Sequence, residues 1–331
     1  MAYTDIDDPS AYFQTALFTG NAGTNAITNT GNSDLQPDWV WFKCRSAAEH
    51  HGLFDSVRGV TKAVYSNLNT AQDNLADSLA SFNSDGFTMG ADTGSGGAFN
   101  GNTKTMVAWQ WKETATAGFD IVSYSGNNST NRQISHSLSA KPDMMLVKCR
   151  QAGLWKIYHS SLGATKYLVL SDTAGVVDNN STWNDTEPTS SNFTLGDDGN
   201  VNETGETYIN YLFAEKQGYS KFGSYVGNGN ADGTFVYTGF KPSFVMVKST
   251  GGESNWQMSD NKRNTFNEVN KHLRANSSGA EFTNYPIDFL SNGFKLRATD
   301  TDTNGSGTTY IYAAFAENPF TTSTGVPATA R

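Results

Sequence analysis

Short apolar runs separated by polar turns make up most of this chain, and one of these runs occurs three times. Residues 310–317 read Tyr-Ile-Tyr-Ala-Ala-Phe-Ala-Glu, and residues 208–215 and 106–113 have the same character. Consecutive copies begin 102 residues apart, and each copy ends in a glutamate. This self-similarity predicts three copies of one structural unit, with the repeated run as the strand that closes each copy.

Two further strands recur in the same order within each copy. An opening strand ends in a Gly-Asn turn near residues 21, 127 and 228, and a second strand begins at a proline at position 37, 142 or 242. The run that follows the second proline, residues 144–147, is apolar at every position. We therefore expect these strands to lie deep and to be covered by a neighbouring copy.

The turns between the strands are rich in Gly, Asn and Asp, and each copy contains roughly seven or eight short strands. No helix is evident between strands, as a parallel βαβ fold would require. We predict an all-β chain of three tandem antiparallel β-sandwich repeats of about 100 residues, with jelly-roll or lectin-like topology. The expected divisions are an N-terminal arm at 1–15, repeats at 16–116, 117–217 and 218–320, and a polar tail at 321–331.

Composition limits the classes of partner. The net charge is −9, which argues against nucleic acid because phosphate binding needs a basic surface. No run of 18 apolar residues occurs, so membrane insertion is not expected, and the acidic start does not resemble a signal peptide. Cys44 and Cys149 hold equivalent positions in consecutive copies, so we predict two buried, reduced thiols, which fits synthesis in a reducing cytoplasm.

The glutamates that end the repeated run, Glu113, Glu215 and Glu317, invite a catalytic interpretation. No second carboxylate recurs at a fixed offset from them, and glycosidase chemistry needs a pair within one site. We therefore predict a structural role for them, no enzymatic activity and no cofactor. A lysine also recurs on the proline strand of each copy, and we hypothesise an ion pair between it and the glutamate, for example between Lys148 and Glu215.

Metal-binding patterns are weak. The histidines do not recur between copies, and no spacing typical of zinc ligands is present. Asp300, Asp302 and Asn304, followed by Gly305, match the start of a calcium loop. The twelfth position of that loop is Ile311 in place of the bidentate glutamate, so we favour a plain turn between strands over a calcium site.

Exposed aromatic residues would indicate a glycan or receptor contact, since aromatic rings stack on sugar faces. Trp155 and Trp256 occupy equivalent positions in two copies, which predicts core residues. Trp183 lies instead in the variable, polar loop 179–185, and it is the best single candidate for such a contact.

Several segments of the first copy resemble a family of repeat-containing structural proteins from the virions of marine bacteriophages, including phages of cyanobacteria. The resemblance is carried by residues 7–15, 36–43, 55–62 and 84–87, and more weakly by the Pro-Asp and Phe-Ala-Glu signatures of the later copies. In the third copy the Pro-Asp signature becomes Pro-Ser at Ser243. The repeated domain of this family is often labelled tail-fibre-like and has no assigned activity, so it supplies no catalytic residues.

The resemblance implies a virion protein made in the host cytoplasm, as a tail fibre or receptor-contacting appendage. A capsid decoration or head-fibre protein is the alternative within this class, and a glycan-binding module is the alternative from another class. The expected partners are other virion proteins and a host-surface glycan or receptor. The three copies could surround a pseudo-threefold axis within one chain, or three chains could form a homotrimer.

Overall fold

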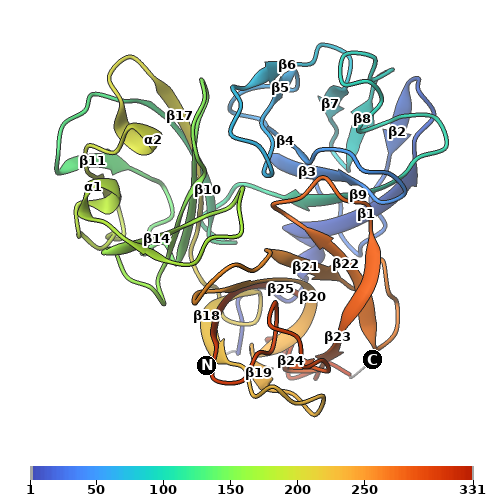
Figure 1. Ribbon diagram of the computed structural model, residues 1–331. Coiled ribbons are helices and arrows are strands. Elements are labelled where there is room, and N and C mark those ends of the chain that lie inside the picture. The colour runs from blue at the N-terminus through green and yellow to red at the C-terminus, as the bar shows by residue number, and fades with distance from the viewer. Residues whose placement is uncertain (1–2, 330–331) are drawn as a thin grey trace.

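The computed structural model describes residues 3–329, and strands dominate it from end to end. Three lobes surround a common centre (Figure 1), and each contains one copy of the repeated strands. We refer to the segments β1–β9, β10–β17 and β18–β25 as the first, second and third repeats. The predicted all-β, antiparallel character is confirmed.

The elements follow one another with short connections. A 3₁₀ turn, η1 (Pro9–Ala11), precedes the first repeat, which holds β1 (Phe13–Thr19), β2 (Asn25–Ile27), β3 (Trp39–Cys44), β4 (Gly52–Asp55), β5 (Lys62–Ala63), β6 (Asp73–Asn74), β7 (Leu79–Phe82), β8 (Phe87–Met89) and β9 (Thr105–Trp111). The second repeat holds β10 (Phe119–Ser125), β11 (Arg132–Ser135), β12 (Met144–Cys149), β13 (Lys156–His159), β14 (Lys166–Val169), β15 (Val177–Asp178), α1 (Asn180–Trp183), β16 (Asn192–Leu195), α2 (Gly199–Asn202) and β17 (Thr207–Phe213). The third repeat holds β18 (Ser220–Val226), β19 (Phe235–Tyr237), β20 (Phe240–Ser249), β21 (Gln257–Asp260), β22 (Val269–Arg274), β23 (Phe282–Leu290), β24 (Gly293–Leu296) and β25 (Thr309–Pro319).

The same strand order recurs in the main sheet of each repeat. These orders are β1-β9-β3-β4, β10-β17-β12-β13-β14-β15 and β18-β25-β20-β21-β22-β23-β24-β19. The closing strand always lies between the opening strand and the proline strand, in antiparallel register with both. Three repeated sequence signals therefore meet as three adjacent strands.

Successive side chains of the proline strands point into two different cores. In β12, Met144 and Leu146 belong to a core shared by all three repeats, whereas Met145 and Val147 belong to a core confined to the second repeat. Because side chains alternate between the faces of a strand, this strand is apolar on both faces. Trp39 on β3 lies in the shared core in the same way. The expectation that such strands are covered by a neighbouring copy is confirmed.

Aromatic rings from all three repeats meet in the shared core. Trp39 stacks on Tyr211 at a centroid distance of 4.4 Å, which joins the first repeat to the second. Phe315 of the third repeat lies edge-on to Phe213 at 5.6 Å and stacks on Phe13 at 5.3 Å. Each such pair contributes about 0.5–1.5 kcal/mol beyond its buried area. The three repeats therefore depend on one another for their largest apolar cluster.

The N-terminal arm lies against the third repeat. The Thr4 hydroxyl donates to the carbonyl of Gln217 (2.8 Å), and Ile6 is buried in the shared core. Asp7 accepts hydrogen bonds from the backbone N–H and the hydroxyl of Ser323 in the tail. β1 begins at Phe13, so the last residues of the predicted arm already belong to a strand.

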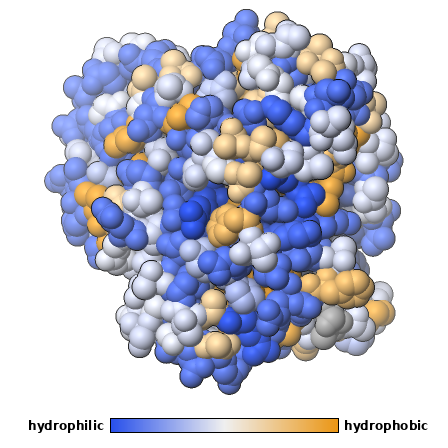
Figure 2. Space-filling view, turned by 45° about the vertical axis from the view of Figure 1, so that its right-hand side comes forward, coloured by the Kyte–Doolittle hydropathy of each residue, from blue (hydrophilic) through white to orange (hydrophobic). Residues whose placement is uncertain are grey.

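The face shown in Figure 2 is mainly hydrophilic, with apolar residues in small scattered groups. Cys44 and Cys149 are buried free thiols, as predicted. Within residues 3–329, no helix is long and apolar enough to cross a membrane.

Candidate functional site

The junctions between repeats contain a recurring set of buried polar groups. We name them junction 1–2, junction 2–3 and junction 3–1 after the repeats that meet there. At each junction a ring N–H from an equivalent position donates to a backbone carbonyl of the adjoining repeat: His51 Nε2 to Arg274 O (2.9 Å), Trp155 Nε1 to Tyr65 O (2.8 Å) and Trp256 Nε1 to Val169 O (2.9 Å).

The proton position on His51 follows from its second contact. Trp41 Nε1 donates to His51 Nδ1 (2.8 Å), so Nδ1 is the acceptor and the proton lies on Nε2. Burial lowers the pKa of His51 well below its usual value, which keeps the ring neutral. In this form the imidazole replaces the indole that the other two junctions use.

The recurring lysines also cross the junctions. The ammonium groups donate to carbonyls of the adjoining repeat, Lys43 to Ser278 O (3.0 Å), Lys148 to Thr70 O (3.0 Å) and Lys248 to Thr173 O (3.2 Å). Each also donates to the carbonyl of the residue that follows it. Burial lowers the pKa of all three lysines to about 8. They remain mostly charged at neutral pH, and several carbonyl oxygens surround each charge.

The predicted pairing of these lysines with the repeated glutamates is wrong. Lys148 lies opposite Ile209, near the start of β17, while Glu215 follows the end of that strand. At about 3.3 Å per residue the two positions are roughly 20 Å apart. Antiparallel register thus places the lysine and the glutamate at opposite ends of each repeat.

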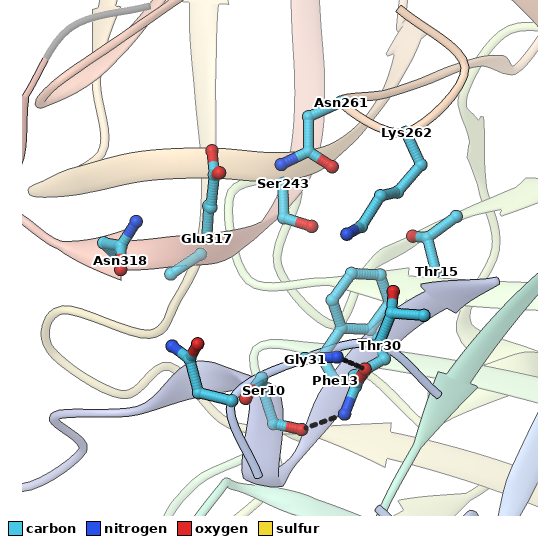
Figure 3. Close-up of a pocket in the computed structure, with 13 residues that line it drawn as sticks. Ser10, Phe13, Thr15, Thr30, Gly31, Ser243, Asn261, Lys262, Glu317 and Asn318 are labelled. Carbon is cyan, nitrogen blue, oxygen red and sulfur yellow. Dashed lines mark hydrogen bonds between the residues drawn. The ribbon is translucent and has the colours of Figure 1, made fainter. Parts of the chain in front are cut away.

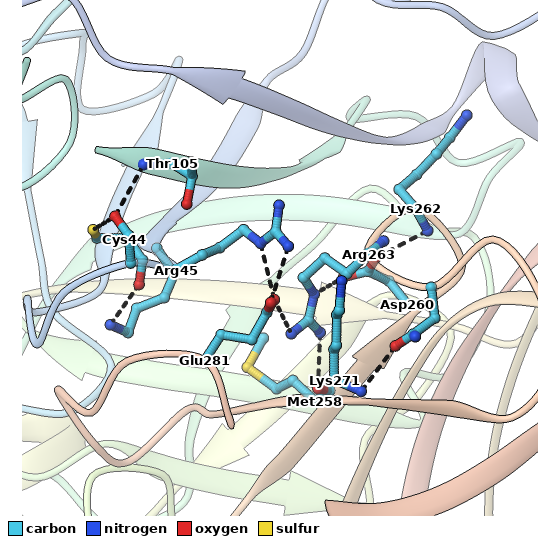
Figure 4. Close-up of polar contacts among 12 residues, drawn as sticks. Cys44, Arg45, Thr105, Met258, Asp260, Lys262, Arg263, Lys271 and Glu281 are labelled. Atoms are coloured by element: carbon cyan, nitrogen blue, oxygen red, sulfur yellow. Dashed lines mark hydrogen bonds and ion pairs between the residues drawn. The ribbon is translucent and has the colours of Figure 1, made fainter. Parts of the chain in front are cut away.

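Two junctions contain a buried Asp–Arg pair. In junction 3–1, Arg263 Nε donates to Asp260 Oδ2 (2.6 Å), and Trp109 Nε1 of the first repeat donates to the same oxygen (3.0 Å). Arg45 of the first repeat forms two hydrogen bonds of 2.9 Å with Glu281, which also contacts Arg263 (Figure 4). Both side chains of the Asp260–Arg263 pair are fully buried.

Junction 1–2 repeats this arrangement with equivalent residues. Arg58 Nε donates to Asp55 Oδ2 (2.5 Å), and the Tyr211 hydroxyl of the second repeat donates to the same oxygen (2.7 Å). Arg58 Nη2 also donates to the Tyr211 oxygen (3.0 Å). An aromatic donor on the neighbouring closing strand therefore completes the Asp–Arg pair at both junctions.

Junction 2–3 uses neutral groups at the same positions. His159, the counterpart of Asp55, hydrogen-bonds through Nε2 to Tyr312 O (3.1 Å). Leu162 packs against the shared core where the other junctions carry an arginine. Burial lowers the pKa of His159 to about 4, so this ring is neutral at physiological pH.

The repeated glutamates lie at the other end of the closing strands. Asp38 and Asp143 of the Pro-Asp signatures accept from the backbone N–H groups of Glu113 and Glu215, at 2.8 Å each. The signature therefore fixes the chain where the closing strand leaves the sheet. In the third repeat, Ser243 replaces the aspartate and has no carboxylate for this contact.

The glutamate side chains differ between junctions. Glu113 accepts from the backbone N–H of Ile121 (3.2 Å), and burial together with a hydrogen bond to Asp120 raises its pKa to about 7. Glu215 pairs with Lys221 (2.6 Å). Both contacts join one repeat to the next.

Glu317 borders a polar cleft in junction 3–1, with a cavity of about 170 Å³ (Figure 3). Its carboxylate lies 3.4 Å from Lys241 Nζ. The cleft is lined by β1 and η1 of the first repeat and by the ends of β20, β21 and β25 of the third, with Ser10, Phe13, Thr15, Ser243, Asn261, Lys262 and Asn318 among the residues that face it.

Trp183 is 1% exposed, so the expectation that it is an exposed contact is wrong. The ring belongs to the core of the second repeat, and its Nε1 donates to Lys166 O (3.1 Å). It ends the short helix α1, in which Thr182 is buried beside it, and the polar sequence of this segment hides that burial.

The candidate calcium ligands point to separate partners. Asp300 accepts from the backbone and hydroxyl of Thr303, while Asp302 accepts from Asn255 and Gln257. No group of three or more His, Cys, Asp or Glu residues that could hold a metal ion occurs among residues 3–329.

Asn304 belongs to a repeated set that the sequence analysis missed. The side-chain N–H groups of three buried asparagines each donate to two backbone carbonyls, Asn100 to Gly23 and Gly90, Asn202 to Ser129 and Gly196, and Asn304 to Asn230 and Ala298. Each Oδ1 accepts from the asparagine of the opening Gly-Asn turn. The signal was available, since these asparagines are also spaced 102 residues apart.

Comparison with known proteins identifies a family whose function is unknown. Residues 8–319 match the model of a domain of unknown function, DUF7483, and this match covers all three repeats. No curated protein and no solved structure matches the chain. The chain therefore belongs to the DUF7483 family of domains of unknown function.

Proposed function

We propose that this chain is a structural protein of a bacteriophage virion, placed on a tail fibre or receptor-contacting appendage. In this proposal its three tandem β-sandwich repeats of about 100 residues form one rigid body. The resemblance of residues 7–15 and 36–43 to virion proteins of marine phages supports the class. The matched family is a domain of unknown function, so the match does not bear on this proposal.

The observation that carries the proposal is the core shared by the three repeats. Buried charges, ring donors and aromatic stacks are concentrated at the junctions, where they fix one repeat against the next. The repeated glutamates and lysines also form contacts between neighbouring repeats. Such an arrangement suits a part that must hold its shape outside the cell and present loops at a fixed distance from an attachment point.

A capsid decoration or head-fibre role is the second candidate within this class, since the same rigid body could attach to a head. Gold-labelled antibody against the purified chain, applied to intact particles from a culture that produces it, separates these cases in the electron microscope. Label on tails is the expected result, and label on heads favours the decoration role. Particles that carry no label, with the chain present only in the particle-free fraction, would contradict the proposal.

A further inference from the structure

The cleft of Figure 3 lies at the only junction that the chain does not cross covalently. Residues 112–118 link the first repeat to the second, and residues 214–219 link the second to the third. The backbone N–H of Ala214, directly after β17, donates to the carbonyl of Gly118, and the N–H of Ala316 on β25 donates to the carbonyl of Tyr219, at 2.8 Å each. At junction 3–1 the equivalent hydrogen bond runs from the backbone N–H of Lys112 to the carbonyl of the arm residue Tyr12 (3.0 Å).

Side chains fill the equivalent space at the other two junctions. The second residue of β10 and of β18 reaches the repeated glutamate, as the Glu113–Asp120 hydrogen bond and the Glu215–Lys221 ion pair. The residue in that position of β1 is Gln14, whose amide is held instead by Ser10 O, Ser33 O and Gly31 N.

The third repeat departs from the pattern around the same space. Ser243 replaces the aspartate of the Pro-Asp signature, and the smaller side chain leaves room in front of Glu317. Asn261 stands where the other repeats have a serine, because Ser56, Ser160 and Asn261 all donate their backbone N–H to the signature residue. The cleft therefore lies where the third repeat differs in sequence from the other two.

The inner wall of the cleft contains polar atoms with no partner in the protein. Thr15 is 5% exposed and Asn261 is 3% exposed, and neither Thr15 Oγ1 nor Asn261 Oδ1 has a hydrogen-bond partner. An unpaired buried polar atom costs about 1–3 kcal/mol, so a ligand that bonds to it recovers a cost already present in the fold. Lys262 and Glu317 border the entrance with opposite charges.

We propose that this cleft binds one neutral sugar residue. Hydroxyl and amide groups on its walls match a ligand that carries many hydroxyls. The Glu317 carboxylate is already balanced by Lys241, and Lys262 is exposed to solvent at the rim, so the cleft holds no buried, unbalanced charge for an ion. A cavity of about 170 Å³ exceeds the ~150 Å³ that holds a benzene ring. The proposal holds whether or not the chain is a virion part.

The test measures binding of glucose, galactose, mannose and N-acetylglucosamine to the full chain by saturation-transfer NMR. We expect at least one sugar to bind with a Kd in the millimolar range. Thr15→Val and Lys262→Gln should each weaken that sugar about fivefold, the effect of one lost hydrogen bond. Ser160→Ala, at the position equivalent to Asn261 in junction 2–3, is the matched control and should bind as the parent chain does.

Thr15→Val also separates binding from folding. The substitution keeps the side-chain volume and removes a hydroxyl that has no partner, so the urea midpoint should stay the same or rise. The proposal is overturned if none of the four sugars binds at concentrations up to about 50 mM. It is also overturned if both variants bind as well as the control, or if inorganic phosphate displaces the bound sugar.

Discussion

The buried Asp260–Arg263 pair gives the sharpest test of junction 3–1. Asp260 accepts four hydrogen bonds, two from the backbone N–H groups of Lys262 and Arg263, one from Arg263 Nε and one from Trp109 Nε1. Asp260→Ala leaves the guanidinium and the indole N–H without this acceptor in the protein interior. Removing one partner of a buried pair costs about 3–5 kcal/mol, so we expect a loss of that size in the free energy of unfolding.

A double variant tests whether the uncompensated charge causes the loss. Asp260→Leu combined with Arg263→Met removes both charges. It leaves the Trp109 N–H and the backbone N–H groups of positions 262 and 263 without this acceptor, at about 1–3 kcal/mol each, and the single variant has the same cost. We therefore expect the double variant to be more stable than Asp260→Ala. Junction 2–3, with His159 and Leu162 at these positions, is a natural example of a junction without the pair.

Urea unfolding followed by circular dichroism measures both variants, with Lys141→Ala as the control. Lys141 pairs with Glu187 on the surface, where both side chains are nearly half exposed, so the control should lose less than about 1 kcal/mol. The reasoning fails if Asp260→Ala costs no more than the control, or if the double variant is less stable than the single one.

Four further predictions concern other parts of the chain. Burial holds the pKa of His159 near 4, so the unfolded chain binds a proton that the folded chain does not, and stability should fall as the pH drops from about 6.5 to 4. His159→Gln should remove about 2–2.5 kcal/mol of that loss in unfolding measured at pH 7 and pH 4.5. Asn202→Ala leaves two backbone carbonyls without their donor and should lower the free energy of unfolding by about 2–3 kcal/mol, whereas Thr130→Ala, on the surface nearby, is the control. Deletion of residues 1–8 removes the buried side chain of Ile6 and the Thr4–Gln217 hydrogen bond, so the melting temperature should fall while the β-sheet circular dichroism spectrum is kept. Addition of EDTA should leave the melting temperature unchanged, and a clear decrease would reveal a bound cation.

The strand framework could be predicted from the sequence because it depends on local repetition. The spacing of 102 residues identified the three closing strands, and the run at residues 144–147 indicated a strand buried on both faces. Equivalent positions also marked Trp155 and Trp256 as core residues, and both are buried. A feature that recurs in all three copies predicts structure better than a feature of one segment, because chance local features seldom recur.

Contacts between strands were harder to predict, because they depend on register and on neighbouring repeats. The interpretation of Lys148 and Glu215 as an ion pair ignored the antiparallel register, which separates them along the strand. Trp183 has polar neighbours, yet the cap at Asn179 starts a short helix that turns the indole inward. The cleft of junction 3–1 is formed by the arm, by Gln14 and by the substituted positions Ser243 and Asn261 of the third repeat. These residues are far apart in the sequence, so no single motif predicts the cleft.

The central claim is that the three repeats form one closed body, and hydrogen exchange of tryptophan indole groups tests it most directly. Each junction has one indole N–H that bonds across it, from Trp155 at junction 1–2, Trp256 at junction 2–3 and Trp109 at junction 3–1. If the body opens only by global unfolding, all three should exchange in NMR as slowly as the most protected amides of β12. Faster exchange at any one of them, while the β12 amides stay protected, would show that this junction opens independently and would contradict the claim.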